Sequence, residues 1–511
     1  MRFLVVALSF LAAVAQARVV EYNFTVGWHT VKPNGVEKRM NLVNGQYPGP
    51  EVRAKVGDTV RVNMHNALGD NSTAIHFHGI NQKRTPFSDG VPGITQWDTK
   101  PGDNYTYEFV PDESGSAFWH SHSKIQYPLG LIGPVVVEEK EGDELWEYDD
   151  EHTIILTDHY DISEWELLAR ALSPGGSNPK IDSLLICSTA GSCNHNQTQH
   201  FNFEPGKTYR LRVINMSATS HFRFSVDEHD LQIIQTDFGK TNGSYAQWVP
   251  LAAAQRIDAL LHTKKNQTDN VWIRSVSMTK CMGGLKDGVS EEVKAVGVFG
   301  KKHQQPFSNA HKFTSKKNCY TLEPHQYAPY HHSPAHRHPV QVTRLAGAMG
   351  KNKQDITTGY VNNQTFDVQA QMLPTLFELM NGKNASELSE DRNAYVLPKK
   401  GPVHLYFDGA QSGGPHPYHL HGHTFKVLGV VPSPFDPKNT TGLNFDAPAH
   451  LDTVLVPGRH TAVIEIEADN PGAWMMHCHM DWHLNAGFAA QLVELPDEFY
   501  NKYGHKDSDK N

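Results

Sequence analysis

The chain is short of cysteine, of long apolar runs and of positive charge. Only 5 of its 511 residues are cysteine, and an odd number excludes complete pairing within the chain. Beyond residue 17 no stretch reaches the roughly 20 apolar residues that span a bilayer, so we expect no membrane anchor. The 46 Lys and Arg are outnumbered by 55 Asp and Glu, which gives a net charge of −9. A nucleic-acid partner is therefore not expected, because phosphate binding needs a positive face.

The first 17 residues have the pattern of a signal peptide. Arg2 precedes the apolar stretch 3–13, and Ala15 and Ala17 form a small-residue cleavage pattern. The alternative is a buried first strand. Ten Asn-x-Ser/Thr sequons agree with export, namely Asn23, Asn71, Asn104, Asn196, Asn215, Asn242, Asn266, Asn363, Asn384 and Asn439. We expect a secreted protein, with Asn215 placed in a strand.

Export implies an oxidising compartment in which cysteines pair. Cys478 lies between two histidines and is the candidate for the unpaired thiol. We expect the disulfides Cys187–Cys193 and Cys281–Cys319, although the spacing leaves other pairings open.

The composition and an internal repeat predict an all-β chain of about three domains. Its 40 Gly, 30 Pro and short apolar runs are typical of many strands joined by turns. Gly57, Gly206 and Gly401 each precede a similar alternating segment. We expect β-sandwiches at 18–142, 143–302 and 340–497. A connector rich in His and Pro at 303–339 and a polar tail at 498–511 complete the chain. The connector reads as a solvated linker, with a separate metal site as its alternative.

Histidine clusters in the first and last thirds are the most informative feature. They are His76/His78, His120/His122, His416/His419/His421/His423 and His477/Cys478/His479/His483. One His-x-His pair can be a chance polar face of a strand. Four clusters, in the two outer copies of a repeat, instead indicate metal binding. The middle copy has the strands but not the paired histidines.

The donor types indicate copper. Two imidazoles and one thiolate in a trigonal site are typical of blue copper, and His416, Cys478 and His483 supply that set. Along residues 477–479, strand alternation sends the sulfur to one side and both imidazoles to the other. The thiolate can thus bind one copper while its neighbours bind a different cluster, which gives electrons a short covalent path.

These clusters resemble the copper signatures of the multicopper oxidases, over about residues 25–497. The resemblance implies three cupredoxin-like Greek-key β-sandwich domains and four copper ions, with O₂ and a small reducing substrate, expected to be phenolic, as partners. It assigns the type 1 copper to His416, Cys478 and His483, and the type 2 copper to His76 and His419. The type 3 pair is assigned to His78, His120, His122, His421, His477 and His479. His423 is expected to be structural.

Three further residues take roles from the resemblance. The axial position of the blue site falls at Phe488. Phenylalanine cannot ligate copper, and loss of an axial donor is expected to raise the potential. Asp89 and Asp481 resemble carboxylates that relay protons to the reduced oxygen, a task that needs hydrogen-bond reach to the site. Their alternatives are turn and capping roles.

The sequence indicates the substrate less clearly than it indicates the metal. Fungal ferroxidases that resemble this chain bind Fe(II) with acids, but here Ser412 replaces one, with Asp408 nearby, and the second falls near Asn202 and Glu204. Laccases carry a middle-domain carboxylate where this chain has 218–221 without an acid, and a cysteine where it has Trp97 and Asp98. We therefore expect a specialised phenol-coupling oxidase, as in pigment or secondary-metabolite synthesis. A ferroxidase and a non-catalytic copper carrier are the alternatives.

Overall fold

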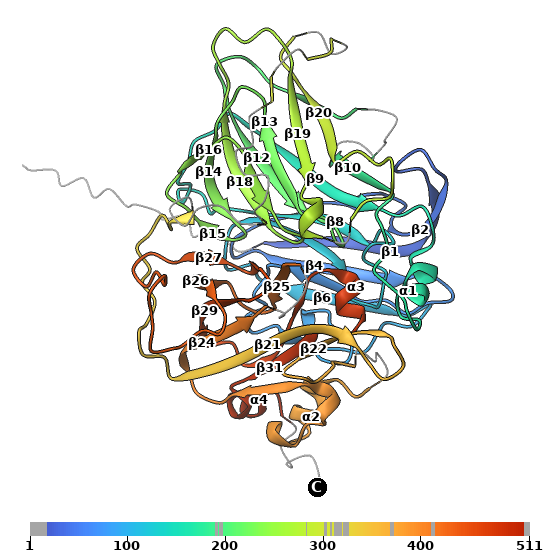
Figure 1. The fold of residues 1–511 in the computed structure, drawn as a ribbon, viewed down its shortest axis with the longest axis vertical. Coiled ribbons are helices and arrows are strands. Elements are labelled where there is room, and N and C mark those ends of the chain that lie inside the picture. The colour runs from blue at the N-terminus through green and yellow to red at the C-terminus, as the bar shows by residue number, and fades with distance from the viewer. Residues whose placement is uncertain are drawn as a thin grey trace, which may run out of the picture.

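Three β-sandwiches built from six sheets make up the computed structural model (Figure 1). The residues it describes are 18–189, 193, 198–282, 284–300, 304–306, 309–310, 319, 327–367, 372–409 and 414–504. The chain is all-β with cupredoxin-like sandwiches, which confirms the predicted fold class. The domain boundaries stay predictions. No helix within these ranges is long and apolar enough to cross a membrane.

The first sandwich contains sheets of order β2-β1-β4-β6 and β3-β8-β7-β5. Its elements are β1 (Val19–Val31), β2 (Lys38–Val43), β3 (Val52–Lys55), β4 (Thr59–Asn66), β5 (Ile75–His78), η1 (Pro86–Ser88), β6 (Asn104–Phe109), β7 (Gly115–Ser121) and β8 (Ile132–Glu138). Every second residue of β4 is buried, because alternate side chains face the core between the sheets.

The middle sandwich contains the orders β10-β9-β12-β18-β14-β15, with β16 on β14, and β11-β20-β19-β13-β17. Its elements are β9 (Asp150–His159), α1 (Glu164–Ala171), β10 (Ser183–Ser188), β11 (His200–Asn202), β12 (Thr208–Asn215), β13 (Phe222–Val226), β14 (Leu231–Thr236), β15 (Gly239–Lys240), β16 (Tyr245–Ala246), β17 (Val249–Leu251), β18 (Arg256–His262), β19 (Val271–Ser277), η2 (Thr279–Cys281) and β20 (Glu292–Val298).

The third sandwich contains the orders β22-β21-β24-β29-β26-β27 and β23-β31-β30-β25-β28. Its elements are β21 (Gln341–Lys351), β22 (Thr357–Val361), α2 (Thr375–Met380), η4 (Ala385–Glu387), η5 (Glu390–Arg392), β23 (Ala394–Leu397), β24 (Gly401–Asp408), β25 (His416–Leu420), β26 (Phe425–Pro432), β27 (Ala449–Leu451), β28 (Thr453–Val456), β29 (His460–Ala468), β30 (Gly472–Cys478), α3 (Asp481–Asn485), β31 (Ala489–Glu494) and α4 (Pro496–Tyr503).

The repeated segments occupy equivalent strands. β4 pairs parallel with β1 and antiparallel with β6. β12 has the same relation to β9 and β18, and β24 to β21 and β29. The internal repeat seen in the sequence is therefore a structural repeat.

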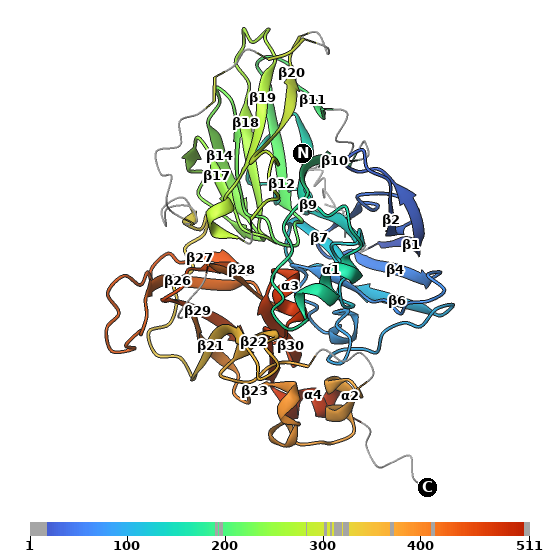
Figure 2. The same ribbon diagram turned by 45° about the vertical axis from the view of Figure 1, so that its right-hand side comes forward.

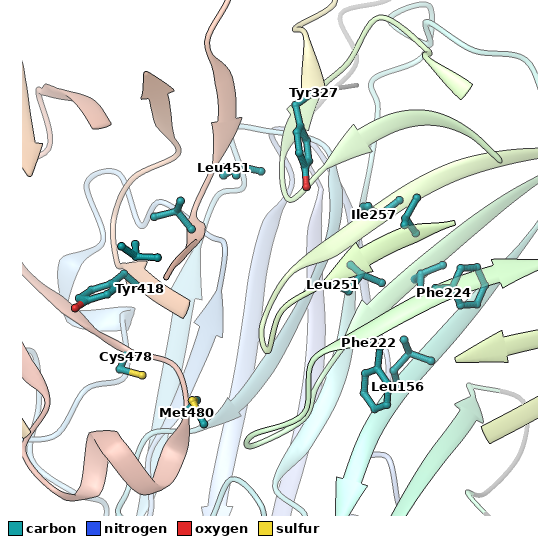
Figure 3. Close-up of a cluster of buried hydrophobic side chains, with 14 of the residues drawn as sticks. Leu156, Phe222, Phe224, Leu251, Ile257, Tyr327, Tyr418, Leu451, Cys478 and Met480 are labelled. Carbon is teal, nitrogen blue, oxygen red and sulfur yellow. The ribbon is translucent and has the colours of Figure 1, made fainter. Parts of the chain in front are cut away.

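The first and third sandwiches lie side by side beneath the middle one (Figure 2). A continuous hydrophobic cluster joins the middle and third sandwiches and includes Phe222, Leu251, Leu451 and Cys478. Figure 3 shows Cys478 at one end of this layer and Phe222 across it. The free sulfur therefore belongs to an apolar core that is continuous through both sandwiches.

The cysteines pair as the sequence predicted. The disulfides Cys187–Cys193 and Cys281–Cys319 are present, and Cys478 is free and buried.

Asn215 ends strand β12 and is fully buried, and its amide donates to the carbonyls of Ser220 and Leu251. Glycosylation at Asn215 is incompatible with this fold. Asn196 lies outside the described residues.

The described part of the connector contacts the third sandwich. The backbone and ring of His336 both bond the carboxylate of Glu465, which also bonds His404. None of the potential metal-binding groups among the described residues includes a connector histidine. The linker interpretation of the connector stays a prediction, because His303, His311 and His325 lie outside the described residues.

Candidate metal centre

Two pairs of adjacent strands position the clustered histidines. β5 pairs with β7, which sets His76 opposite His120. β25 pairs with β30, which sets His419 opposite His477. The same strand pair of the repeat thus supplies the clusters from both outer sandwiches, and the contact between these sandwiches brings the clusters together.

Eight histidines meet there in what we call the eight-histidine cluster. Its members are His76, His78, His120, His122, His419, His421, His477 and His479, all at most 3% exposed. Ring nitrogens within 4.8 Å of one another form the groups His76/His419/His421, His76/His78/His120 and His122/His421/His477. Nε2 of His479 lies 3.1 Å from Nδ1 of His78, across the two sandwiches. The cluster is therefore shared by the first and third sandwiches.

A second group, the sulfur cluster, consists of His416, Cys478 and His483. The Cys478 sulfur lies 3.5 Å from Nδ1 of each histidine, and these two nitrogens are 3.2 Å apart. His483 comes from the short helix α3, which begins three residues after Cys478. All three donors converge on one point from a single sandwich.

Cys478 connects the two clusters. Its sulfur faces His416 and His483, whereas Nε2 of the preceding His477 lies 3.3 Å from Nε2 of His421. The following His479 faces His78. This is the arrangement that strand alternation predicted for residues 477–479.

In nine of the ten histidines of the two clusters, burial lowers the ring pKa, which favours the neutral form that can bind a metal. Burial lowers the pKa of His416 and His477 to about 4. Burial, followed by repulsion among neighbouring histidines, lowers the pKa further for His78, His120, His122, His419, His421, His479 and His483. Burial also raises the pKa of the Cys478 thiol, so we expect the thiolate to form only with a bound metal.

Unpartnered nitrogens show that the eight-histidine cluster suits metal ions. Among the described residues, no hydrogen-bond partner is found for the buried Nε2 atoms of His76, His120 and His419 or for the buried Nδ1 of His479. Both ring nitrogens of His122 also lack a partner there. Buried polar atoms normally have partners, and metal ions would satisfy these. The imidazole-rich donors of one cluster and the two imidazoles and thiolate of the other both fit copper.

Asp89 lies against the eight-histidine cluster. Its carboxylate accepts from Nδ1 of His421 at 3.0 Å and lies 3.3 Å from Nδ1 of His76, so it bridges the two outer sandwiches. The next residue, Gly90, has φ +83°, and a Cβ there would lie 1.9 Å from the carbonyl oxygen of Ile75. Glycine is needed to bring Asp89 this close.

Asp481 is the first residue of α3, between the candidate ligands His479 and His483 in the chain. It is 4% exposed, and its Oδ2 has no hydrogen-bond partner among the residues that the structure describes. Burial, and then repulsion from Asp158, raises the pKa of Asp481 well above its ordinary value. Its backbone N–H donates to the carbonyl of Ala218 in the middle sandwich.

Phe488 packs against the sulfur cluster. Its ring centroid lies 5.1 Å from that of His416, and its carbonyl accepts from the Cys478 N–H. Gly347 and Gly359 make room for it, since a Cβ on either would come within 2.6 Å of Phe488. The predicted axial position therefore holds a buried ring without donor atoms.

The sequence did not reveal two residues that contact the clusters. Asp452 lies 3.2 Å from Nε2 of His78 and forms an ion pair with Arg256 of the middle sandwich. The amide of Asn178, in the loop after α1, lies 2.8 Å from Nε2 of His483. Neither residue belongs to a sequence motif with the spacing typical of metal ligands. Each has its contact only because the sandwiches dock against one another.

The residues at the positions of the ferroxidase acids form hydrogen bonds and ion pairs with other parts of the protein. Asp408 pairs with Arg344 and accepts from the Thr461 hydroxyl. The Asn202 carbonyl accepts from His152, and Glu204 bonds Tyr209 and Thr263 through its backbone. Asn178 of the middle sandwich contacts His483, and no hydrogen bond joins Asn202 or Glu204 to His483 among the described residues. Ser412 lies outside the described residues.

Family models described as multicopper oxidase match residues 25–142, 150–293 and 334–498. The chain is 32% identical to Laccase-2 of Fomitopsis schrenkii, over 96% of this chain and 93% of that protein. It is 30% identical to the iron transport multicopper oxidase FET3 of Kluyveromyces lactis, over 98% of this chain and 79% of that protein.

Solved structures show the same similarity. Fet3p, described as a multicopper oxidase that functions in iron import, superposes with a TM-score of 0.87 at 27% identity, covering 96% of this chain and 93% of that one. The laccase from Botrytis aclada gives 0.86 at 26% identity, with coverages of 97% and 90%. Four coppers, as one type 1, one type 2 and a type 3 pair, are the standard complement of this family. With similarity along almost its whole length and two clusters suited to copper, the chain belongs to the multicopper oxidase family.

Proposed function

We propose that this multicopper oxidase takes single electrons from a small phenolic substrate and reduces O₂ to water. The observation that carries the phenolic assignment is the contact between Nε2 of His483 and the neutral amide of Asn178. In the structure the amide nitrogen of Asn178 faces Nε2. A metal on Nδ1 would leave the ring proton on Nε2, and the amide would then turn its oxygen toward it. A neutral group at this edge suits an uncharged aromatic substrate better than Fe(II).

The contacts of Asp408 also favour a phenol over Fe(II). Iron binding would need a free carboxylate close to the sulfur cluster, but Asp408 is 7% exposed and is neutralised by Arg344. Releasing it would leave the Arg344 charge unpaired. The relatives do not separate the two substrates, since laccases and iron-transport oxidases have similar identities to this chain.

The copper assignments are part of the proposal. The sulfur cluster would hold the type 1 copper, His76 and His419 the type 2 copper, and the other six histidines the type 3 pair. Bound copper supplies the one-electron chemistry. The chain supplies the path from the Cys478 sulfur through residues 477–479 into the eight-histidine cluster.

Asp89 and Asp481 have different proposed roles in proton delivery. Asp89 accepts from Nδ1 of His421 through its carboxylate and from Nδ1 of His76 through its backbone carbonyl, which orients the Nε2 atoms of both rings into the cluster. Burial raises the pKa of Asp481, which favours its protonated form. Water formation consumes four protons per O₂, and a buried acid two residues from both His479 and His483 could donate one and be reprotonated.

Oxygen uptake on a substrate panel tests the proposal. With copper-loaded protein we expect faster turnover of 1-naphthol and catechol than of Fe(II). Asn178→Asp should raise Fe(II) turnover, because a carboxylate then faces the His483 edge, and Asn178→Ala serves as the matched control. Faster Fe(II) turnover by the unmodified protein would overturn the phenolic assignment.

We propose secretion as the location, on the basis of the signal-peptide pattern of residues 1–17, which lie outside the described residues. Exposed sequons such as Asn23, Asn104 and Asn439 are compatible with glycosylation.

A further inference from the structure

Asp452 is a buried residue of the third sandwich that contacts a candidate ligand from each outer sandwich. Its carboxylate oxygen Oδ1 lies 3.2 Å from Nε2 of His78, in the first sandwich. Its backbone carbonyl accepts from Nδ1 of His419, in the third sandwich, at 2.8 Å. Asp452 immediately precedes strand β28 and is 1% exposed. One buried residue therefore bonds two of the eight histidines.

The His78 ring is fixed in its plane by stacking and in its orientation by Asp452. The ring stacks on those of His419 and Phe118, whose centroids lie 3.7 and 4.6 Å away. Stacking does not distinguish this ring from one flipped about its Cβ–Cγ bond, in which carbon atoms take the places of both nitrogens. The hydrogen bond does distinguish them, because a carboxylate can accept only where the ring presents an N–H.

The same hydrogen bond determines which nitrogen of His78 is free to bind a metal. Burial, and then repulsion from His419 and Arg256, lowers the pKa of His78, which favours a neutral ring with one N–H. With that N–H on Nε2, facing Asp452, the lone pair is on Nδ1. Nδ1 lies 3.1 Å from Nε2 of His479, so these two nitrogens can share one ion across the outer sandwiches.

Arg256 of the middle sandwich fixes the Asp452 carboxylate. Its Nη1 and Nη2 donate to the two carboxylate oxygens, and this two-pronged geometry leaves the carboxylate one orientation. Its Nε donates to the carbonyl of Ser116, in the first sandwich, at 2.9 Å. Gly79, which follows His78, makes room for the guanidinium, since a Cβ there would lie 2.6 Å from Nη2. The middle sandwich supplies none of the predicted ligands, yet it reaches the cluster through Arg256 and Asp452.

We infer that Asp452, held by Arg256, is a positioning residue that orients His78 for metal binding in the eight-histidine cluster. Carboxylate partners of metal-bound histidines fix the tautomer and orientation of the ring, and their loss costs about 10–100-fold in metal affinity. The inference rests on the copper assignments of the proposed function but not on its substrate. A contact between domains, and not the ligands alone, then determines how firmly copper is held where His78 and His479 meet.

Removing the acceptor tests the inference in the copper-loaded protein. Asp452→Ala takes away the partner of the His78 Nε2–H, whereas Asp452→Asn keeps a neutral oxygen there. Asp237→Asn is the matched control, because Asp237 also pairs with Arg256 but has no hydrogen bond to a histidine among the described residues. Copper should leave Asp452→Ala at a chelator concentration about 10–100-fold lower than it leaves the unmodified protein. Asp452→Asn should lie between the two, and Asp237→Asn should match the unmodified protein.

The EPR spectrum supplies a second readout that a general loss of stability would not produce. Two magnetically coupled Cu(II) ions give no EPR signal, whereas a Cu(II) ion that has lost its partner does. Asp452→Ala should therefore show a new Cu(II) signal as copper is lost. Its type 1 absorbance should be unchanged, because the substitution leaves His416, Cys478 and His483 in place. Asp237→Asn should give the spectrum of the unmodified protein.

Equal copper retention and equal EPR spectra in Asp452→Ala and the unmodified protein would overturn the role of Asp452. If Asp452→Ala does not fold, the comparison of Asp452→Asn with Asp237→Asn decides, and equal copper retention in these two would overturn it as well. A single bound copper in the unmodified protein would instead overturn the copper assignments, so the two failures are distinguishable.

Discussion

Arg256 of the middle sandwich and Asp452 of the third form a two-pronged ion pair against the eight-histidine cluster. Nη1 and Nη2 of Arg256 bond the two carboxylate oxygens at 2.7 and 2.6 Å, and both side chains are at most 2% exposed. Arg256 also pairs with Asp237, whose carboxylate accepts from the Asp452 N–H. One guanidinium thus compensates two buried acids beside the predicted ligands His78 and His419.

Arg256→Met is expected to destabilise the protein strongly. Removing one partner of a buried ion pair costs about 3–5 kcal/mol, because the remaining charge is uncompensated. Urea unfolding of the copper-free protein would measure this loss. As a control, Arg170→Ala removes the exposed pair with Glu166 and should change stability by less than about 0.5 kcal/mol. Similar losses in the two variants would contradict the role given to Arg256.

Cys478→Ser is expected to abolish both the blue colour and oxygen uptake, because the sulfur is the proposed link between the clusters. The histidines of the eight-histidine cluster do not depend on this sulfur, so about three coppers per chain should remain, following the ligand preferences of copper. Absorbance, oxygen consumption and copper content check these outcomes. Retention of colour and turnover would remove the basis of the copper assignments.

Phe488→Met is expected to lower the reduction potential of the type 1 copper by tens of millivolts, since a thioether could act as a weak axial donor. Phe488→Leu is the matched control, because it changes the packing against Gly347 and Gly359 without adding a donor. Redox titration of the type 1 absorbance measures the difference. If both variants shifted the potential equally, packing rather than ligation would set it.

Asp98 gives a prediction for pH. Burial raises the pKa of Asp98 to about 6, above the value of about 3.9 expected in the unfolded chain. The folded state therefore favours the protonated form. Its stabilising contribution is complete below about pH 4 and is lost as the pH rises through about 6. Asp98→Asn should stabilise the protein at pH 8 by about 1–2 kcal/mol and have little effect at pH 4.

Urea unfolding at the two pH values tests the Asp98 prediction, with the exposed Asp103→Asn as control. A gain of the same size at both pH values would show that ionisation of Asp98 is not responsible. The Ser123 hydroxyl that bonds Asp98 can also bond an asparagine, so the variant leaves this contact available.

Strand alternation and the internal repeat were enough to predict the candidate ligands and the sides of the strand to which they point. The ligand candidates are adjacent along the chain, as His477, Cys478 and His479 are, and alternation separates their side chains correctly. The sequence pattern could not predict the contact between Asn178 and His483, which are 305 residues apart in the chain, or the ion pair between Arg256 and Asp452. Those contacts depend on the docking of three sandwiches, which no local pattern encodes.

The hydrophobic cluster that contains Cys478 extends from the third sandwich into the middle one. In the copper-loaded protein, the blue chromophore would therefore belong to a core that two domains share. During unfolding by heat or denaturant, loss of the blue absorbance and separation of these two sandwiches should then have the same midpoint, so the colour would report whether the domains remain docked.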